Sequence, residues 1–142
     1  MLSSNLIHPE ILGVLATAGH GSKVLIADGN YPFATTGGPN TEIVYMNLAP
    51  DVITCTQALE ALLSVQPIEA AAVMDVPPSY KEDPPIWSEF RKIIGKAGYD
   101  LAFDKIERFK FYETIAQEST ALIIATGDKR LFANLLLTLG CA

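Results

Sequence analysis

The sequence has few cysteines, few basic residues and no long apolar run. Its two cysteines, Cys55 and Cys141, belong to no Cys-X-X-Cys pair and have no second histidine nearby, so neither a disulfide framework nor a zinc site is expected. Ten Lys and Arg residues against 16 Asp and Glu residues give a net charge of −6, which argues against nucleic acid and anionic membranes as partners. The chain shows no signal peptide and no apolar run of about 18 residues. We therefore expect a cytoplasmic protein with reduced thiols.

The chain has the length and apolar content of one buried core. Its 142 residues correspond to a single domain, which we place at residues 1–142. Hydrophobic residues make up 49% and charged residues only 18% of the chain. This is more apolar than a solvated monomer requires, so we expect part of the surface to be covered by further copies of the chain.

Helical periodicities and apolar runs alternate along the sequence. They predict helices at residues 9–19, 50–66, 86–97 and 109–117, and strands at residues 23–27, 43–47, 68–74 and 121–125. A further strand-like stretch starts at Leu101 and ends at Glu107-Arg108. The strands are apolar throughout, which is typical of strands covered on both faces. This pattern indicates the α/β class, with one largely parallel sheet flanked by helices. Residues 131–139 are too uniformly apolar to assign by periodicity, although a strand is favoured for part of them.

Two irregular segments stand out between these elements. Residues 29–42 are rich in glycine, proline and asparagine, and their length favours a binding or interface role. Gly37-Gly38 could suggest a nucleotide-binding domain, but no glycine-rich phosphate motif is present. The prolines of residues 77–85 indicate a stiff surface loop.

Polar residues follow several of the predicted strands. His20 lies between two glycines before the first strand, and Asp28 comes directly after it. Asp75, Arg108 and Asp128 stand at or beyond the ends of later strands. His20 and Asn134 lie close to such strand ends in sequence. Because the carboxyl ends of parallel strands meet at one edge of a sheet, the candidates at those ends are expected to converge there. We expect His20 and Asp28 to face a common cavity.

Each of these residues also has a purely structural interpretation. His20 could be a surface residue or a helix cap, and Asp28 and Asp128 could cap turns. Arg108 could form a surface ion pair, and Tyr112 could serve packing. These alternatives stay open at the level of the residues alone.

The candidate residues favour one kind of chemistry. The sequence has no serine in a nucleophile elbow, no cysteine beside a base and no metal-ligand spacing. What remains is a histidine, carboxylates, an amide and an arginine. Carboxylates and amides hold sugar hydroxyls, and a histidine both donates and accepts protons near neutral pH. The set therefore suits proton transfer on an uncharged, hydroxyl-rich ligand.

Four short segments carry a resemblance to a known family. They read Gly19-His20-Gly21, Ala27-Asp28-Gly29-Asn30-Tyr31-Pro32, Glu107-Arg108-Phe109-Lys110-Phe111-Tyr112-Glu113, and Thr126-Gly127-Asp128 with Ala133-Asn134. In this order, across almost the whole chain, they resemble the RbsD/FucU family of D-ribose pyranases and L-fucose mutarotases. The resemblance implies the RbsD-like fold and an isomerase that needs neither a cofactor nor a metal.

The resemblance also implies roles for single residues. His20 matches the family's general acid/base, and Asp28 matches the aspartate that holds sugar hydroxyls. Arg108 occupies the substrate-contacting position that is arginine in fucose mutarotases and histidine in ribose pyranases. Tyr112 matches a tyrosine of the fucose branch. The chain is therefore closer to that branch.

One segment departs from the family pattern. Phe132-Ala133-Asn134 matches a sugar-contacting segment that normally reads Tyr-Gly-Asn or Tyr-Ala-Asn. Phe132 lacks the hydroxyl that could donate to the sugar, at an expected cost of about 0.5–1.5 kcal/mol for one hydrogen bond. Apolar contact with the methyl group of a deoxy sugar would survive.

The function implied is anomer interconversion of a monosaccharide, L-fucose or a related deoxyhexose, by His-assisted ring opening and closure. The family assembles into rings, commonly decamers, with sites at subunit boundaries, so a homo-oligomer is expected. Two alternatives stay open: a ribose pyranase-type isomerase, and a sugar-binding or regulatory homologue that has lost turnover because of Phe132.

Overall fold

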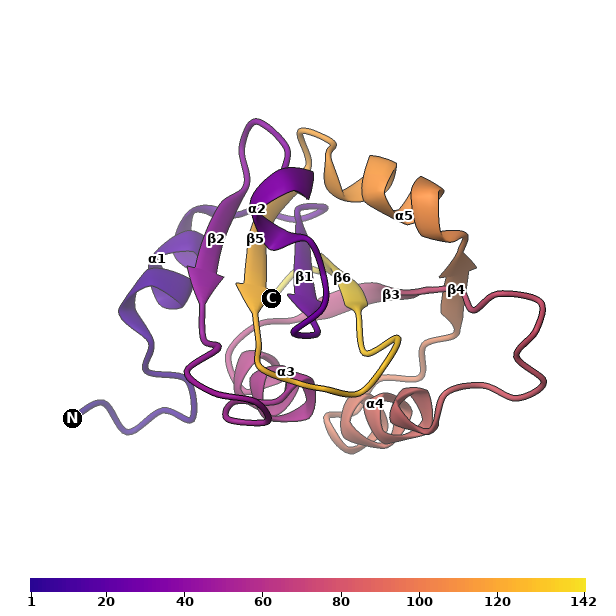
Figure 1. Cartoon of the computed structure of the whole chain (residues 1–142). Coiled ribbons are helices and arrows are strands. Elements are labelled where there is room, and N and C mark those ends of the chain that lie inside the picture. The colour runs from indigo at the N-terminus through magenta and orange to yellow at the C-terminus, as the bar shows by residue number, and fades with distance from the viewer.

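The computed structural model describes residues 1–142 as one six-stranded mixed sheet flanked by helices (Figure 1). The strands are β1 Lys23–Ala27, β2 Glu42–Tyr45, β3 Ile68–Met74, β4 Phe103–Ile106, β5 Thr120–Ala125 and β6 Leu135–Leu139. The helices are α1 Pro9–Thr17, α2 Phe33–Thr36, α3 Cys55–Leu63, α4 Pro85–Lys96 and α5 Arg108–Ile115. None of the helices has both the length and the apolar character needed to cross a membrane.

The sheet has the order β2-β5-β1-β6-β3-β4. Strand β6 pairs antiparallel with β1 on one side and β3 on the other, and all other neighbours are parallel. The predicted α/β fold with a largely parallel sheet is therefore confirmed, with β6 as the exception. The strand favoured within residues 131–139 is also confirmed, at Leu135–Leu139.

The two faces of the sheet are covered unequally. Successive side chains of a strand point to opposite faces, and in β1 Val24 and Ile26 join one core while Leu25 and Ala27 join the other. The first core has 23 buried residues and includes α1, α3 and α4; the second has nine and rests mainly on α5. Figure 1 shows α3 and α4 on one side of the sheet and α2 and α5 on the other.

The predicted start of the second helix at Pro50-Asp51 is wrong. The helix begins at Cys55, and Thr54 caps it by a box in which the Thr54 hydroxyl accepts from the Gln57 N–H while the Gln57 side chain accepts from the Thr54 N–H. Asp51 has a φ of 59°, which is incompatible with a right-handed helix. Its N–H donates to the Gly127 carbonyl at 2.7 Å. The segment around Asp51 is therefore hydrogen-bonded to the residues that follow β5.

Other boundaries also differ from the sequence predictions, and two of these differences change a short element. The predicted loop at 29–42 contains the short helix α2, although most of it is irregular. The strand-like stretch predicted from Leu101 to Glu107-Arg108 is shorter in the structure and runs from Phe103 to Ile106. Both differences concern short elements whose ends depend on neighbouring chain segments.

Candidate functional site

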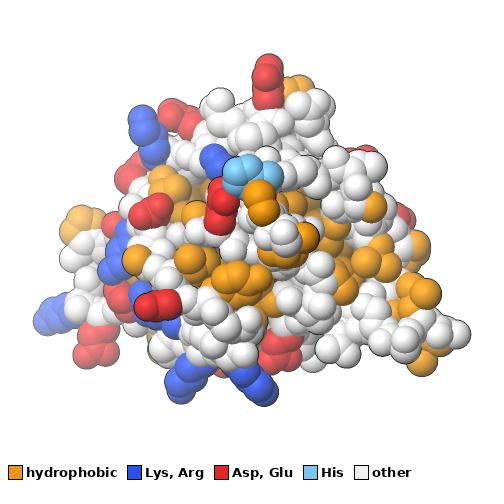
Figure 2. Space-filling view, turned by 180° about the vertical axis from the view of Figure 1, so that it is seen from behind, with side chains coloured by type: hydrophobic (Ala, Val, Ile, Leu, Met, Phe, Trp, Pro, Cys, Tyr) orange, Lys and Arg blue, Asp and Glu red, His pale blue; other side chains and the backbone are white.

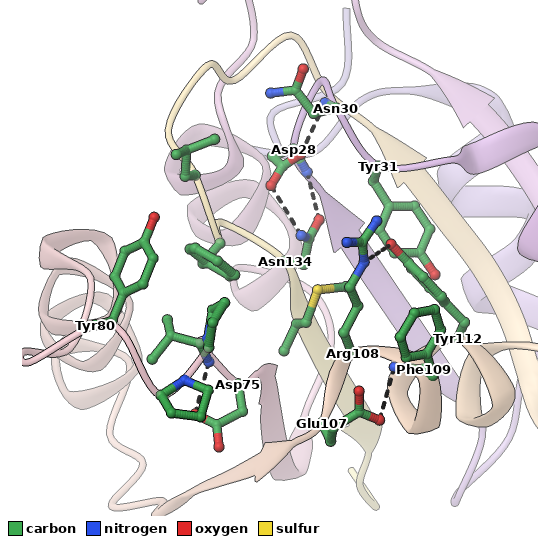
Figure 3. Close-up of a pocket in the computed structure, with 16 residues that line it drawn as sticks. Asp28, Asn30, Tyr31, Asp75, Tyr80, Glu107, Arg108, Phe109, Tyr112 and Asn134 are labelled. Atoms are coloured by element: carbon green, nitrogen blue, oxygen red, sulfur yellow. Dashed lines mark hydrogen bonds between the residues drawn. The ribbon is translucent and has the colours of Figure 1, made fainter.

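A cavity of about 620 Å³ opens at the carboxyl ends of β1, β3 and β4 (Figure 3). Its lining also includes the start of α5, the loop of residues 76–80 and the segment of residues 131–134 just before β6. Such crevices at the carboxyl edge of a sheet are the usual ligand sites of α/β folds. Of the predicted site residues, it brings together Asp28, Arg108, Tyr112, Phe132 and Asn134.

Asp28 and Asn134 form the polar floor of this cavity. The Asn134 Nδ2 donates to Asp28 Oδ2 at 3.0 Å, and the Asp28 N–H donates to Asn134 Oδ1 at 3.0 Å. The other carboxylate oxygen accepts from the Asn30 N–H at 2.9 Å. Burial raises the pKa of the Asp28 carboxyl, and the hydrogen bonds from Asn30 and Asn134 offset only part of that effect. The carboxylate is thus held at a defined orientation beside the cavity.

Arg108 and Tyr112 face the cavity from the first turns of α5. The Arg108 Nε donates to the Tyr112 hydroxyl at 3.0 Å, and the guanidinium lies 5.7 Å from the ring centroids of Tyr112 and Phe109. No carboxylate lies within 4.0 Å of Arg108, so the surface ion pair considered above is not present. Its terminal N–H groups are therefore free for a ligand.

Glu107 orients the helix that carries these two residues. Its carboxylate accepts from the N–H groups of Phe109 and Lys110 at 3.0 and 3.1 Å, which makes it the N-cap of α5. This cap holds the start of the helix, and with it the backbone of Arg108, at the rim of the cavity (Figure 3).

An aromatic pair forms the opposite, apolar wall. The rings of Tyr80 and Phe132 meet edge to face with centroids 5.1 Å apart, and Figure 3 shows Tyr80 across the cavity from Arg108 and Tyr112. Phe132 has a φ of 60°, which is unusual for a bulky residue. Tyr80 was not predicted, because nothing in the proline-rich loop around it signals proximity to residue 132.

His20 does not line this cavity. It precedes β1, whereas Asp28 follows it, so the two residues lie at opposite ends of the same strand. The His20 Nε2 is instead 2.7 Å from a carboxylate oxygen of Glu69, near the start of β3. Within one chain the two side chains therefore do not face one cavity, because the extended strand β1 separates them. The expected common cavity stays a prediction for an assembly that includes neighbouring copies.

Two other predicted residues lie outside the cavity lining. Ala133 is completely buried and packs in the larger core, so its side chain is not available to a ligand. Asp128 is also completely buried, and both of its carboxylate oxygens accept hydrogen bonds from Arg130, at 2.9 and 2.7 Å. Burial opposes ionisation of Asp128, but the hydrogen bonds from Arg130 and from the Cys55 N–H outweigh it and lower its pKa. Asp128 therefore has a structural role and does not contact a ligand in this cavity.

The cavity lining also includes Asp75 and Tyr31. Asp75 directly follows β3 and lines the cavity, with its carboxylate accepting from the Val76 N–H at 2.8 Å. Tyr31 packs against Tyr112 with ring centroids 5.7 Å apart, and burial raises its pKa to about 12. Tyr31 thus supports the wall and stays protonated at neutral pH.

The arrangement suits an uncharged ring with hydroxyls on one side. Asp28 and Asn134 form the floor, Arg108 and Tyr112 lie on one side, and the rings of Tyr80 and Phe132 form the opposite side. Apolar walls with a few converging polar groups are typical of small-molecule sites. No three His, Cys, Asp or Glu side chains converge to hold a metal ion.

The chain is similar to known proteins along almost its whole length. The RbsD / FucU transport protein family matches residues 1–142. The human fucose mutarotase is 39% identical over 145 residues, which cover 95% of this chain and 89% of the human protein. The zebrafish (Danio rerio) fucose mutarotase is 34% identical, with 96% and 90% covered.

Solved structures show the same fold. The fucose mutarotase from Streptococcus pneumoniae in complex with L-fucose has a TM-score of 0.81 at 26% identity, over 96% of this chain and 94% of that one. FucU from Bifidobacterium longum has a TM-score of 0.82 at 32% identity, over 98% and 99%. RbsD from Bacillus subtilis complexed with D-ribose shares the fold, with a TM-score of 0.77 at 17% identity over 100% and 99%. The chain therefore belongs to the RbsD/FucU family.

Proposed function

We propose that this protein is a sugar mutarotase that interconverts the anomers of L-fucose or a closely related deoxyhexose. The observation that carries the proposal is the pairing of Asp28 with Asn134 in a cavity that also holds the guanidinium of Arg108, which has no carboxylate partner. The similarity to fucose mutarotases at 34–39% identity supports the same activity.

The polar floor and Arg108 would hold the sugar by its hydroxyls. Asp28 and Asn134 are mutually oriented, so they would accept from and donate to neighbouring hydroxyls with little loss of side-chain freedom on binding. The free N–H groups of Arg108 would donate to a further sugar oxygen. The rings of Phe132 and Tyr80 would contact the apolar side of the sugar, including the methyl group of a deoxyhexose.

The reaction is a redox-neutral opening and reclosure of the sugar ring, assisted by proton transfer. A base removes the proton from the anomeric hydroxyl, the bond between C1 and the ring oxygen breaks, and an acid protonates the ring oxygen. The open aldehyde rotates, and the ring oxygen attacks its other face with the reverse proton transfers. The Tyr112 hydroxyl accepts from Arg108, so its own proton is free to be donated toward the cavity.

His20 would supply the second proton-transfer group from a neighbouring copy of the chain. His20 precedes β1, whereas the cavity of the same chain lies at the other end of that strand. The imidazole could therefore act only on the cavity of another copy. Exposed apolar side chains such as Leu48, 86% exposed, and Tyr45, 57% exposed, favour such an assembly. Figure 2 shows hydrophobic side chains gathered across the centre of one face, with charged side chains mostly toward one edge. A closed ring, such as the family's decamer, would place the sites at subunit boundaries.

The test is an NMR exchange experiment on reducing sugars. Saturation of one anomeric proton of L-fucose should transfer to the other anomer faster with the protein than in buffer. Faster exchange between ribopyranose and ribofuranose but not between fucose anomers would instead identify a ribose pyranase. Saturable fucose binding without exchange would identify a non-catalytic homologue. Absence of both exchange and binding across fucose, ribose and galactose would contradict the proposal.

A further inference from the structure

We propose that Trp87 is a positioning residue for this site: its indole N–H holds the segment of residues 132–134 and thereby the orientation of Asp28. Trp87 lies on α4, in the core on one side of the sheet, and does not line the cavity. Its Nε1 donates to the Phe132 carbonyl at 3.0 Å. The part of the proposal that concerns sugar turnover rests on the proposed function, and the part that concerns Asp28 does not.

The Phe132 backbone needs such a restraint. Its φ of 60° lies in the left-handed region, where a side chain with a Cβ is disfavoured. Such conformations persist where surrounding contacts impose them, and they cluster at ligand sites. The hydrogen bond from Trp87 holds the carbonyl of this strained residue, while the ring of Tyr80 packs on its side chain.

Trp87 is itself rigidly placed. The side chain is completely buried and packs with Ile86 and Phe90 in the larger core. The Lys105 Nζ lies 5.2 Å from the centroid of its ring, within the range of a cation–π interaction. A donor fixed on a helix can therefore hold an irregular segment 45 residues away in sequence.

Asn134 connects the segment that Trp87 holds to Asp28. Asn134 is two residues after Phe132 and exchanges two hydrogen bonds with Asp28. A shift of the segment at Phe132 would displace the Asn134 amide and free the Asp28 N–H. The geometry thus connects the indole of α4 to the carboxylate at the end of β1 by consecutive hydrogen bonds and backbone.

Hydrogen exchange of the Asp28 amide tests this connection without any sugar. Trp87→Phe removes the indole N–H, and Phe90→Leu serves as the control because Phe90 is equally buried in the same helix but makes no hydrogen bond to the site. We expect Asp28 exchange in Trp87→Phe to be at least about threefold faster relative to the Ile26 amide of β1. In Phe90→Leu this ratio should stay at the wild-type value. Equal ratios in the two variants would overturn the proposal.

A second replacement keeps the test decisive if Trp87→Phe does not fold. Trp87 is the only tryptophan, so biosynthetic replacement of tryptophan by benzothienylalanine exchanges only this N–H for sulfur and preserves ring size. The same increase in Asp28 exchange is expected, and an unchanged ratio would overturn the proposal.

Turnover provides the functional measurement. In the benzothienylalanine protein we expect the KM for L-fucose to rise about three- to tenfold while kcat stays within about twofold, because a ground-state binding contact is loosened. Unchanged KM and kcat would contradict the positioning role. Wild-type protein without fucose exchange would instead contradict the mutarotase activity, whereas the amide exchange result would stand.

Discussion

Asn134 and Asp28 lie 106 positions apart in the chain and are joined by two hydrogen bonds of 3.0 Å. The pairing follows from the antiparallel alignment of β1 and β6, in which Ile26 lies opposite Leu135. The residue that follows β1 therefore meets the residue that precedes β6. The antiparallel direction of β6 relative to β1 thus creates the polar floor of the cavity.

Because of this pair, we expect Asn134→Ala to lower both the stability of the fold and the anomer exchange rate. The substitution leaves the buried Asp28 N–H and one carboxylate oxygen without partners, which should lower the free energy of unfolding by about 1–3 kcal/mol. The anomer exchange rate at low L-fucose concentration should fall at least about tenfold for the same reason. Urea unfolding and NMR exchange measure the two effects.

Asn40→Ala is the matched control for this prediction. The Asn40 side chain makes a hydrogen bond too, from its Nδ2 to the Glu118 carbonyl at 3.0 Å, but Asn40 is exposed and does not line the cavity. We expect a change of less than about 1 kcal/mol and normal exchange. Equal exchange rates in the two variants would argue against a binding role of Asn134.

The position of His20 predicts complementation between two inactive variants. His20→Ala lacks the imidazole and Arg108→Ala lacks the free guanidinium of the cavity, so each alone should lose most of its exchange activity. If His20 serves the cavity of a neighbouring copy, oligomers assembled from an equal mixture should regain about one quarter of the wild-type activity by random assortment. The two variants are co-refolded and assayed by NMR exchange.

A mixture of the two separately assembled oligomers is the control and should stay inactive. Co-refolded protein without any gain would contradict the intersubunit role. Undiminished activity of His20→Ala alone would remove His20 from the mechanism.

Phe132→Tyr should increase activity. The Phe132 side chain lines the cavity but offers no polar atom, and a hydroxyl there could donate to the sugar. One added hydrogen bond corresponds to an increase in kcat/KM of up to about tenfold. Tyr80→Phe removes a hydroxyl from the adjoining ring, which should retain its edge-to-face contact, and is the control. A slower Phe132→Tyr enzyme would mean that the site depends on an apolar residue at this position.

The buried Asp128 predicts a pH-dependent contribution to stability. Its pKa is lowered below 3.8 in the folded protein, so the stabilisation is fully present above about pH 5 and is lost as the pH falls through the folded-state value. Asp128→Asn should therefore cost roughly 2–4 kcal/mol at pH 7, less than for a fully buried pair because Arg130 is partly exposed, and progressively less below pH 4.

Asp83→Asn is the comparison for this ion pair. Asp83 pairs with Lys105 at 2.8 Å, but both side chains are over 40% exposed, so the change should stay below about 1 kcal/mol. Unfolding free energies across pH 3–7 measure both variants. A cost of Asp128→Asn that does not shrink in acid would contradict a charge-based contribution.

Much of the fold could be predicted from local sequence signals. The strand at residues 68–74 was predicted with its exact bounds, because Pro67 and the polar Asp75 delimit an apolar run. The carboxyl-edge placement of Asp28 followed from the same reasoning, since a residue after a parallel strand lies at that edge. Helix α3 was misplaced because the capping box at Thr54 competes with the equally plausible start signal of Pro50-Asp51.

The site required information that no local pattern carries. The direction of β6 cannot be read from five apolar residues, yet it brings Asn134 to Asp28. The separation of His20 from the Asp28 end of β1, by contrast, was readable from the sequence, since His20 precedes that strand and Asp28 follows it. The packing of Tyr80 on Phe132 joins two loops that are distant in sequence. Local propensities decide which residues form strands, whereas contacts between distant segments, which form only when the sheet assembles, decide which side chains share a cavity.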